Sequence, residues 1–230
     1  MLAEAIQHLY DVFARYDSST LDESCACCIT RADIEPLRSK GLREFTADDL
    51  SCYSFKAMTT FGTVRDYKHF LPRLCELIAT TPFPKNVEIV LAGKLEFAGF
   101  ADWPPDERAA VEQYLHALWD DLLHNWPYHE QADVVLCCIT RVLGSPERPL
   151  EVWSALLLTE RSARLHLANW LSWGPGCNDQ PPPFWDEAPE GWAQVVAWLR
   201  SPAVGSVMEA AFVEWADTAE GAKWYGTPKT

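Results

Sequence analysis

The sequence has few basic residues. It contains 19 lysines and arginines against 33 aspartates and glutamates, which gives a formal net charge of −14. Binding to a phosphate backbone needs a clustered basic surface, so this composition argues against a nucleic-acid partner. An acidic surface instead favours solubility or the electrostatic attraction of a basic protein.

Long apolar runs and an export signal are also missing. No stretch approaches the roughly 18 uninterrupted apolar residues that a membrane-spanning helix needs, so we expect no membrane partner. The first eight residues, Met1 to His8, lack a basic region followed by a long apolar one. We therefore expect them to begin the first helix of the fold and not to form a signal peptide.

The sequence motifs of common catalytic sites are absent as well. There is no G-x-S-x-G nucleophile elbow, no phosphate-binding P-loop, no dinucleotide fingerprint and no H-E-x-x-H metalloprotease motif. The sequence therefore predicts no catalytic residue, and it favours a binding protein over an enzyme.

The negative charge that is present is concentrated in two segments. Between residues 101 and 133, eight acids stand against one base, and the same numbers hold between residues 178 and 220. The rest of the chain is balanced, with 17 acids and 17 bases. If the two segments meet in the fold, they form one acidic face.

Apolar residues recur at intervals of three and four along most of the chain, which indicates amphipathic helices. The clearest helix is expected from Pro105 to Trp126. A run of β-prone residues at 87–91 could form a strand, but no second strand candidate offers it a partner, so we favour a helix over residues 87–97. The apolar stripe of the clearest helix consists of Val111, Tyr114, Leu115, Leu118, Trp119, Leu122 and Leu123.

These patterns predict an all-α fold of nine or ten helices. Short loops between successive helices favour antiparallel neighbours, either in a solenoid-like α-α array or in an irregular bundle. We expect a single helical domain over residues 1–230, with 1–82 and 83–230 as an alternative subdivision. Capping boxes are predicted at Thr30–Asp33 and at Thr46–Asp49, each at the start of a helix.

Eight cysteines are present, and we expect them to be reduced. Cys27–Cys28 and Cys137–Cys138 are adjacent pairs, in which a disulfide would need strained geometry. Cys52, Cys75 and the second pair lie in helical patterns, where a free cysteine behaves as a small hydrophobe. Without an export signal, reduced thiols predict a cytoplasmic location.

Cys25-x-Cys27-Cys28 is the candidate metal site that the sequence favours. Three thiols within four residues could bind zinc, with His69 or Cys52 supplying a fourth ligand. The alternatives are thiols that pack beside a helix start, two of them buried, and a redox-reactive thiol with a lowered pKa. No other cofactor is expected.

The same cysteines contribute to a resemblance. Together with the stretches 55–62 (FKAMTTFG) and 66–73 (DYKHFLPR), the C-x-C-C motif resembles a family of bacterial proteins for which no activity is known. The resemblance covers about the first eighty residues. It implies a bacterial source, and it does not point to any reaction or ligand.

The tryptophans point to a candidate protein-binding site. There are eleven, none before Trp103, and Trp185 lies in a long proline-rich segment between residues 174 and 189. Phe184 and Trp185, followed by Asp186 and Glu187, resemble an aromatic anchor with an acidic rim, although the loop could equally pack its aromatic residues back onto the domain. Two further acids, Asp120 and Asp121, are assigned to the same function.

The leading functional hypothesis is an acidic, non-enzymatic helical protein that binds a basic protein. Its most specific version is a bacterial immunity or inhibitor protein that neutralises a basic toxin domain. The alternative is a zinc-binding protein, or a small metal-dependent enzyme, that uses the three clustered cysteines.

Overall fold

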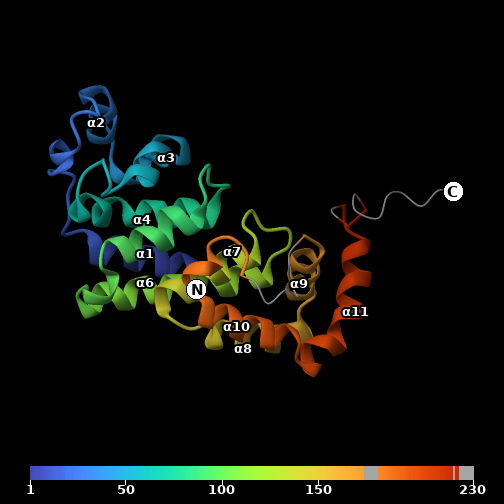
Figure 1. Cartoon of the computed structure of the whole chain (residues 1–230). Coiled ribbons are helices and arrows are strands. Elements are labelled where there is room, and N and C mark those ends of the chain that lie inside the picture. Colours follow the sequence, from blue (N-terminus) through green and yellow to red (C-terminus); the bar gives the residue numbers. More distant parts are fainter. Residues whose placement is uncertain (174–180, 220, 223–230) are drawn as a thin grey trace. The chain divides into compact units, whose positions relative to one another are not determined.

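The computed structural model describes residues 1–173, 181–219 and 221–222. This part of the chain forms eleven α-helices joined by short 3₁₀ turns and one π-helical segment (Figure 1). The only β-type pairing among the described residues is an isolated bridge between Ala57 and Phe61. The prediction of an all-α fold is confirmed.

The chain folds as two compact units, Met1–Leu118 and Trp119–Thr230, which we call the N-terminal unit and the C-terminal unit. The division lies inside helix α6 (Pro105–His124). The alternative subdivision at residue 82 falls instead between α4 and the π-helical segment η3, within the N-terminal unit. The acidic segment 101–133 is consequently divided between the two units.

In the N-terminal unit the central element is α4, which packs against α1 and α3 (Figure 1). Its buried face includes Phe70, Leu71, Leu74 and Ile78, none of which is exposed to solvent. The helices and turns of this unit before α6 are α1 (Leu2–Phe13), η1 (Leu21–Glu23), α2 (Arg31–Arg38), η2 (Leu42–Glu44), α3 (Ala47–Lys56), α4 (Val64–Thr80), η3 (Glu88–Gly93), α5 (Lys94–Phe97) and η4 (Phe100–Asp102).

Capping boxes formed by a threonine and an aspartate start three of these helices. The predicted boxes at Thr30–Asp33 and Thr46–Asp49 are confirmed at the start of α2 and α3. A third box, which the sequence analysis did not single out, joins Thr63 to Asp66 and starts α4 at Val64. In each box the acid accepts a hydrogen bond from the backbone amide of the threonine, which satisfies a donor that the helix leaves unpaired.

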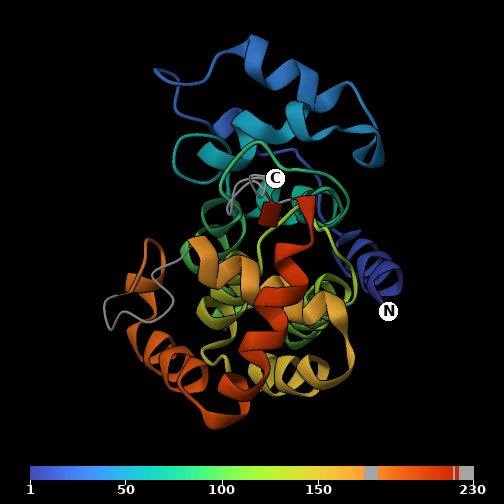
Figure 2. The same ribbon diagram turned by 90° about the vertical axis from the view of Figure 1, so that its right-hand side faces the viewer.

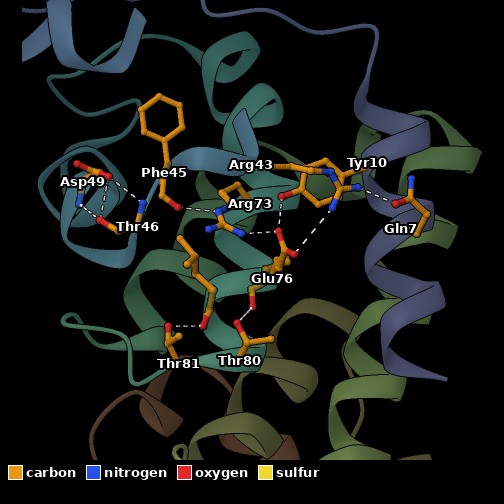
Figure 3. Close-up of polar contacts among 12 residues, drawn as sticks. Gln7, Tyr10, Arg43, Phe45, Thr46, Asp49, Arg73, Glu76, Thr80 and Thr81 are labelled. Carbon is orange, nitrogen blue, oxygen red and sulfur yellow. Dashed lines mark hydrogen bonds and ion pairs between the residues drawn. The ribbon is translucent and has the colours of Figure 1, made fainter. Parts of the chain in front are cut away.

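A polar network around Glu76 fixes the turn η2 against α1 and α4 (Figure 3). The Glu76 carboxylate accepts hydrogen bonds from the Tyr10 hydroxyl at 2.5 Å and from Arg73 Nη1 at 2.6 Å. Arg73 also donates to the carbonyl of Phe45, just before α3, and Arg43 lies over the Tyr10 ring at 3.6 Å. Burial acts to raise the pKa of Glu76, but hydrogen bonds from Tyr10 and Arg73 lower it overall, so the carboxylate stays ionised.

The segment predicted as a helix over residues 87–97 is helical from residue 88 onward, and its first part is a π-helix. Helix α4 continues through Pro72 as a single helix.

The C-terminal unit contains the end of α6 and five further helices, with α9 packing against α7, α8 and α11. Figure 2 shows α11 running across α9. Helix α8 ends at Thr159 and α9 begins at Arg161, so Glu160 alone separates the two helices. The elements after α6 are α7 (Ala132–Leu143), α8 (Glu147–Thr159), α9 (Arg161–Trp173), η5 (Trp185–Glu187), α10 (Pro189–Leu199) and α11 (Pro202–Ala216).

Tryptophans form much of the core of this unit. The Trp153 ring contacts Trp119, Trp170 and Trp198, with centroids 5.2, 5.8 and 5.0 Å away. The Trp119 and Trp153 indole nitrogens donate to backbone carbonyls, so these polar atoms are satisfied inside the core. The predicted stripe of α6 is confirmed, because all seven of its residues are buried.

Among the described residues, none of the helices combines the length and the apolar character that crossing a membrane requires.

Candidate functional site

The three clustered cysteines lie on a short loop between η1 and α2. The loop is tied at two points to the chain between α3 and α4: the Cys25 amide donates to the Thr60 carbonyl at 2.9 Å, and the Gly62 amide donates to Ser24 Oγ at 2.8 Å. On either side of the loop, the side chains of Leu21 and Ile29 are buried. The loop is therefore held by backbone hydrogen bonds and by two apolar anchors.

Within the loop the chain turns tightly enough to bring the thiols together. The amides of Cys28 and Ile29 both donate to the Cys25 carbonyl at 2.9 Å. The sulfur of Cys27 lies 2.9 Å from that of Cys25 and 3.5 Å from that of Cys28, and all three sulfurs lie within 4.8 Å of one another. Cys27 and Cys28 are exposed and Cys25 is half-buried, so the cluster faces solvent. The alternative expectation of two buried thiols is wrong.

The three thiols do not hold their protons equally. Hydrogen bonds from the Cys27 thiol and from the Cys27 and Cys28 backbone amides lower the pKa of the Cys25 thiol. The hydrogen bond between the Cys27 and Cys25 thiols, followed by the one with Cys28, raises the pKa of Cys27 to about 11. Cys25 consequently becomes a thiolate more readily than Cys27.

Neither of the fourth ligands suggested by the sequence lies in the cluster. Among the described residues, the group of potential metal ligands comprises the three cysteines alone. His69 lies on α4, where its Nδ1 is 3.0 Å from the Tyr16 carbonyl. Cys52 is exposed on α3, in contrast to its predicted role as a small buried hydrophobe, whereas Cys75, Cys137 and Cys138 are buried as expected.

Gly62 gives a test of how the loop is held. It has a φ of 67°, and an added Cβ would lie 2.8 Å from Oδ2 of the buried Asp66, which Thr20 and Thr63 already fix by hydrogen bonds. Gly62→Ala is expected to destabilise the chain by more than Gly99→Ala, because Gly99 has the same φ but open space around its Cα. The Gly99→Ala control should lower the free energy of unfolding by about 1–2 kcal/mol, the penalty for an alanine in the left-handed conformation. Urea unfolding of both variants measures the difference, and equal losses would contradict it.

The predicted aromatic anchor is not on the surface. Trp185 is 2% exposed, and its ring packs against that of Trp192 in α10, with centroids 5.3 Å apart. Phe184 is half-buried with a φ of 69°, and the tight turn there directs the next side chain inward. In this structure Trp185 is therefore part of the core and not an exposed anchor. The alternative expectation, that this segment packs back onto the domain, describes its aromatic residues better.

The acids assigned to the same site have different environments. Asp186 and Glu187 are exposed in η5, and Asp120 is 65% exposed near the end of α6. Asp121 is half-buried and accepts a hydrogen bond from the Tyr128 hydroxyl at 3.0 Å, so it helps to hold the chain after α6. Three of the four predicted acids therefore face solvent.

The two units differ in how their charges are arranged. In the N-terminal unit many acids are paired with bases far apart in the sequence, as in Arg15–Asp106, Arg38–Asp22 and Arg65–Asp17. On the described surface of the C-terminal unit, eight exposed acids stand against three exposed arginines. The acids are Asp120, Glu147, Glu151, Asp186, Glu187, Glu190, Glu209 and Asp217, and the arginines are Arg148, Arg161 and Arg200.

Sequence reasoning missed the residues that hold the cysteine loop. The segment Thr59–Thr63, between α3 and α4, supports Cys25 through the Thr60 carbonyl. Gly62 and the third capping box, which begins at Thr63, were the available signals, since both mark a fixed turn.

Comparison with known proteins adds no relative. No protein-family model, curated protein or solved structure matches this chain.

Proposed function

We propose that this chain is a non-enzymatic helical protein that binds a basic protein through the acidic surface of its C-terminal unit. The observation that carries the proposal is the excess of exposed acids over exposed arginines on that unit. Such a surface attracts a positively charged partner and raises the rate of association. It also repels phosphate backbones, so a nucleic acid is not the proposed partner.

The more specific version of the proposal is an inhibitor or immunity protein that neutralises a basic toxin domain in a bacterial cytoplasm. The charge supports it, because an acidic inhibitor and a basic target associate rapidly and with electrostatic selectivity. None of the seven described cysteines forms a disulfide in the structure, and free thiols of this number are usual in a reducing compartment. In this version the captured partner is basic, and it is toxic when it is produced without this chain.

The burial of Trp185 changes where binding is expected. The binding surface is assigned to exposed acids such as Asp186, Glu187 and Glu190, around the start of α10, and no longer to an indole side chain. Charged side chains at the rim of an interface act mainly on the association rate and its salt dependence. Binding is therefore expected to be sensitive to salt.

The test compares two charge-neutralised variants. Asp186→Asn/Glu187→Gln removes two charges from the C-terminal unit, and Glu23→Gln/Asp48→Asn removes two exposed charges from the N-terminal unit. A partner is captured on the immobilised chain from a bacterial lysate at low salt and identified by mass spectrometry, and its association rate is then measured with purified proteins. The first variant should slow association at low salt by about 10-fold, the lower end of electrostatic steering, and the second should not.

Two results would contradict the proposal. One is a captured partner whose association rate is the same for both variants and does not change between low and high salt. The other is the absence of any specifically retained protein at low salt.

A further inference from the structure

The loop that carries the three cysteines is already arranged as a ligand-binding turn. Its first residues, Ser24 and Cys25, are fixed by hydrogen bonds with Gly62 and Thr60, and its last residue, Ile29, is buried. Its interior is fixed by the two amides that donate to the Cys25 carbonyl. A site built in this way loses little conformational entropy when it binds a ligand, because its backbone is ordered beforehand.

The ligand set selects a particular class of metal ion. Three sulfurs, with no carboxylate or imidazole among the described residues of the cluster, form a soft set, which zinc and monovalent copper prefer to magnesium or calcium. Zinc–sulfur bonds are about 2.3 Å long, which places the sulfurs of a tetrahedral site about 3.8 Å apart. The sulfur separations of 2.9 and 3.5 Å therefore need to widen by less than about 1 Å around an ion.

Cysteines bind a metal ion as thiolates. Metal ligation by thiols releases their protons, so the three sulfurs would give up their protons when the ion enters.

We propose that Cys25, Cys27 and Cys28 bind one zinc ion through three thiolates, and that a water molecule or another exogenous ligand occupies the fourth coordination position. A zinc site with three protein ligands and one open position is the arrangement that can bind and polarise a further ligand, whereas closed four-ligand sites are structural. The exposure of Cys27 and Cys28 leaves that position accessible. This site lies in the N-terminal unit and is independent of the protein-binding surface proposed above.

The experiment titrates the reduced, metal-free full-length chain with Co²⁺, whose visible absorption reports tetrahedral thiolate coordination, and then with Zn²⁺ against a chromophoric chelator. We expect one ion per chain. Cys27→Ser and Cys28→Ser should each weaken zinc binding by at least about 100-fold, the upper end of what losing an outer-shell partner costs. Because both side chains are exposed, neither substitution should change the circular dichroism spectrum.

Two cysteine variants are matched controls. Cys52→Ser removes an exposed thiol outside the cluster, and Cys177→Ser removes one that lies outside the described residues. Both should bind zinc as the unchanged chain does. Addition of imidazole should shift the Co²⁺ spectrum without releasing the ion, since the fourth position exchanges.

Three outcomes would overturn the inference. The first is the absence of stoichiometric zinc binding, including the case in which only monovalent copper binds. The second is zinc binding that Cys27→Ser and Cys28→Ser leave unchanged. The third is evidence that a fourth protein ligand closes the site. Such evidence would be an equal loss of zinc affinity in either control variant, or a Co²⁺ spectrum that imidazole does not shift.

Discussion

Replacing Glu107 with alanine is expected to destabilise the N-terminal unit by about 3–5 kcal/mol, the cost of leaving one member of a buried ion pair without its partner. The Glu107 carboxylate is fully buried, 2.6 Å from the Lys68 ammonium, and it also accepts a hydrogen bond from the Tyr16 hydroxyl. The Lys68 side chain is 9% exposed, and its cation–π contact with the Trp103 ring, whose centre is 4.1 Å away, would replace only part of the lost interaction with the carboxylate. Without Glu107, the nearest acceptor left to Lys68 is the Tyr16 hydroxyl at 3.4 Å.

The neighbouring residue in α6 supplies the control. Asp106 pairs with Arg15, but both side chains are about half exposed, so Asp106→Ala should cost no more than about 1 kcal/mol. The double variant Lys68→Met/Glu107→Leu should regain most of the loss, because it removes both charges and fills the space with apolar groups. Hydrogen exchange of peptides from α4, followed by mass spectrometry, reports on this unit alone. Equal protection of the α4 peptides from hydrogen exchange in the Glu107→Ala and Asp106→Ala variants would refute the prediction.

Contacts of this kind explain the limit of what the sequence predicted. The helices were predictable because their signals are local: a stripe of apolar residues at intervals of three and four marks α6, and threonine followed three residues later by aspartate marks α2 and α3. The pairing of Lys68 with Glu107 joins residues 39 positions apart, and nothing in either neighbourhood specifies the other.

The candidate sites show the same division between local and distant information. The cluster of Cys25, Cys27 and Cys28 was predictable because three thiols within four residues have little choice but to lie close together. His69 was suggested by its chemical type, but its place on α4 sets it against the Tyr16 carbonyl. The distribution of acids was visible in the sequence, whereas the extensive pairing of acids in the N-terminal unit required the fold.

Replacing Trp185 with alanine is expected to destabilise the C-terminal unit by about 3–5 kcal/mol, the usual cost of removing a buried aromatic side chain. The Trp185 ring packs against Trp192, which in turn contacts Trp170, and Trp170 stacks with Trp153. Loss of the indole would leave a cavity at one end of this series of rings, and the surrounding helices could fill it only in part.

Asp186→Ala and Glu187→Ala are the controls in the same turn. Both side chains are exposed, so each substitution should change the free energy of unfolding by no more than about 0.5 kcal/mol. Urea unfolding followed by tryptophan fluorescence suits this unit, which contains ten of the eleven tryptophans. Hydrogen exchange in peptides from α10 should rise in the Trp185→Ala variant only.

This prediction separates two roles that the local sequence leaves equally open. An aromatic anchor that waits for a partner is exposed in the free protein, so its removal weakens binding and leaves the free energy of unfolding almost unchanged. A core tryptophan has the opposite signature, because its removal lowers the free energy of unfolding whether or not a partner is present. If Trp185→Ala unfolds at the same urea concentration as the unchanged chain, the indole is not a core residue in solution, and the aromatic anchor becomes the better explanation. If Trp185→Ala unfolds at a lower urea concentration while Asp186→Ala does not, the tryptophan is a core residue that stabilises the acidic turn η5. The exposed carboxylates are then the groups that recognise the basic partner.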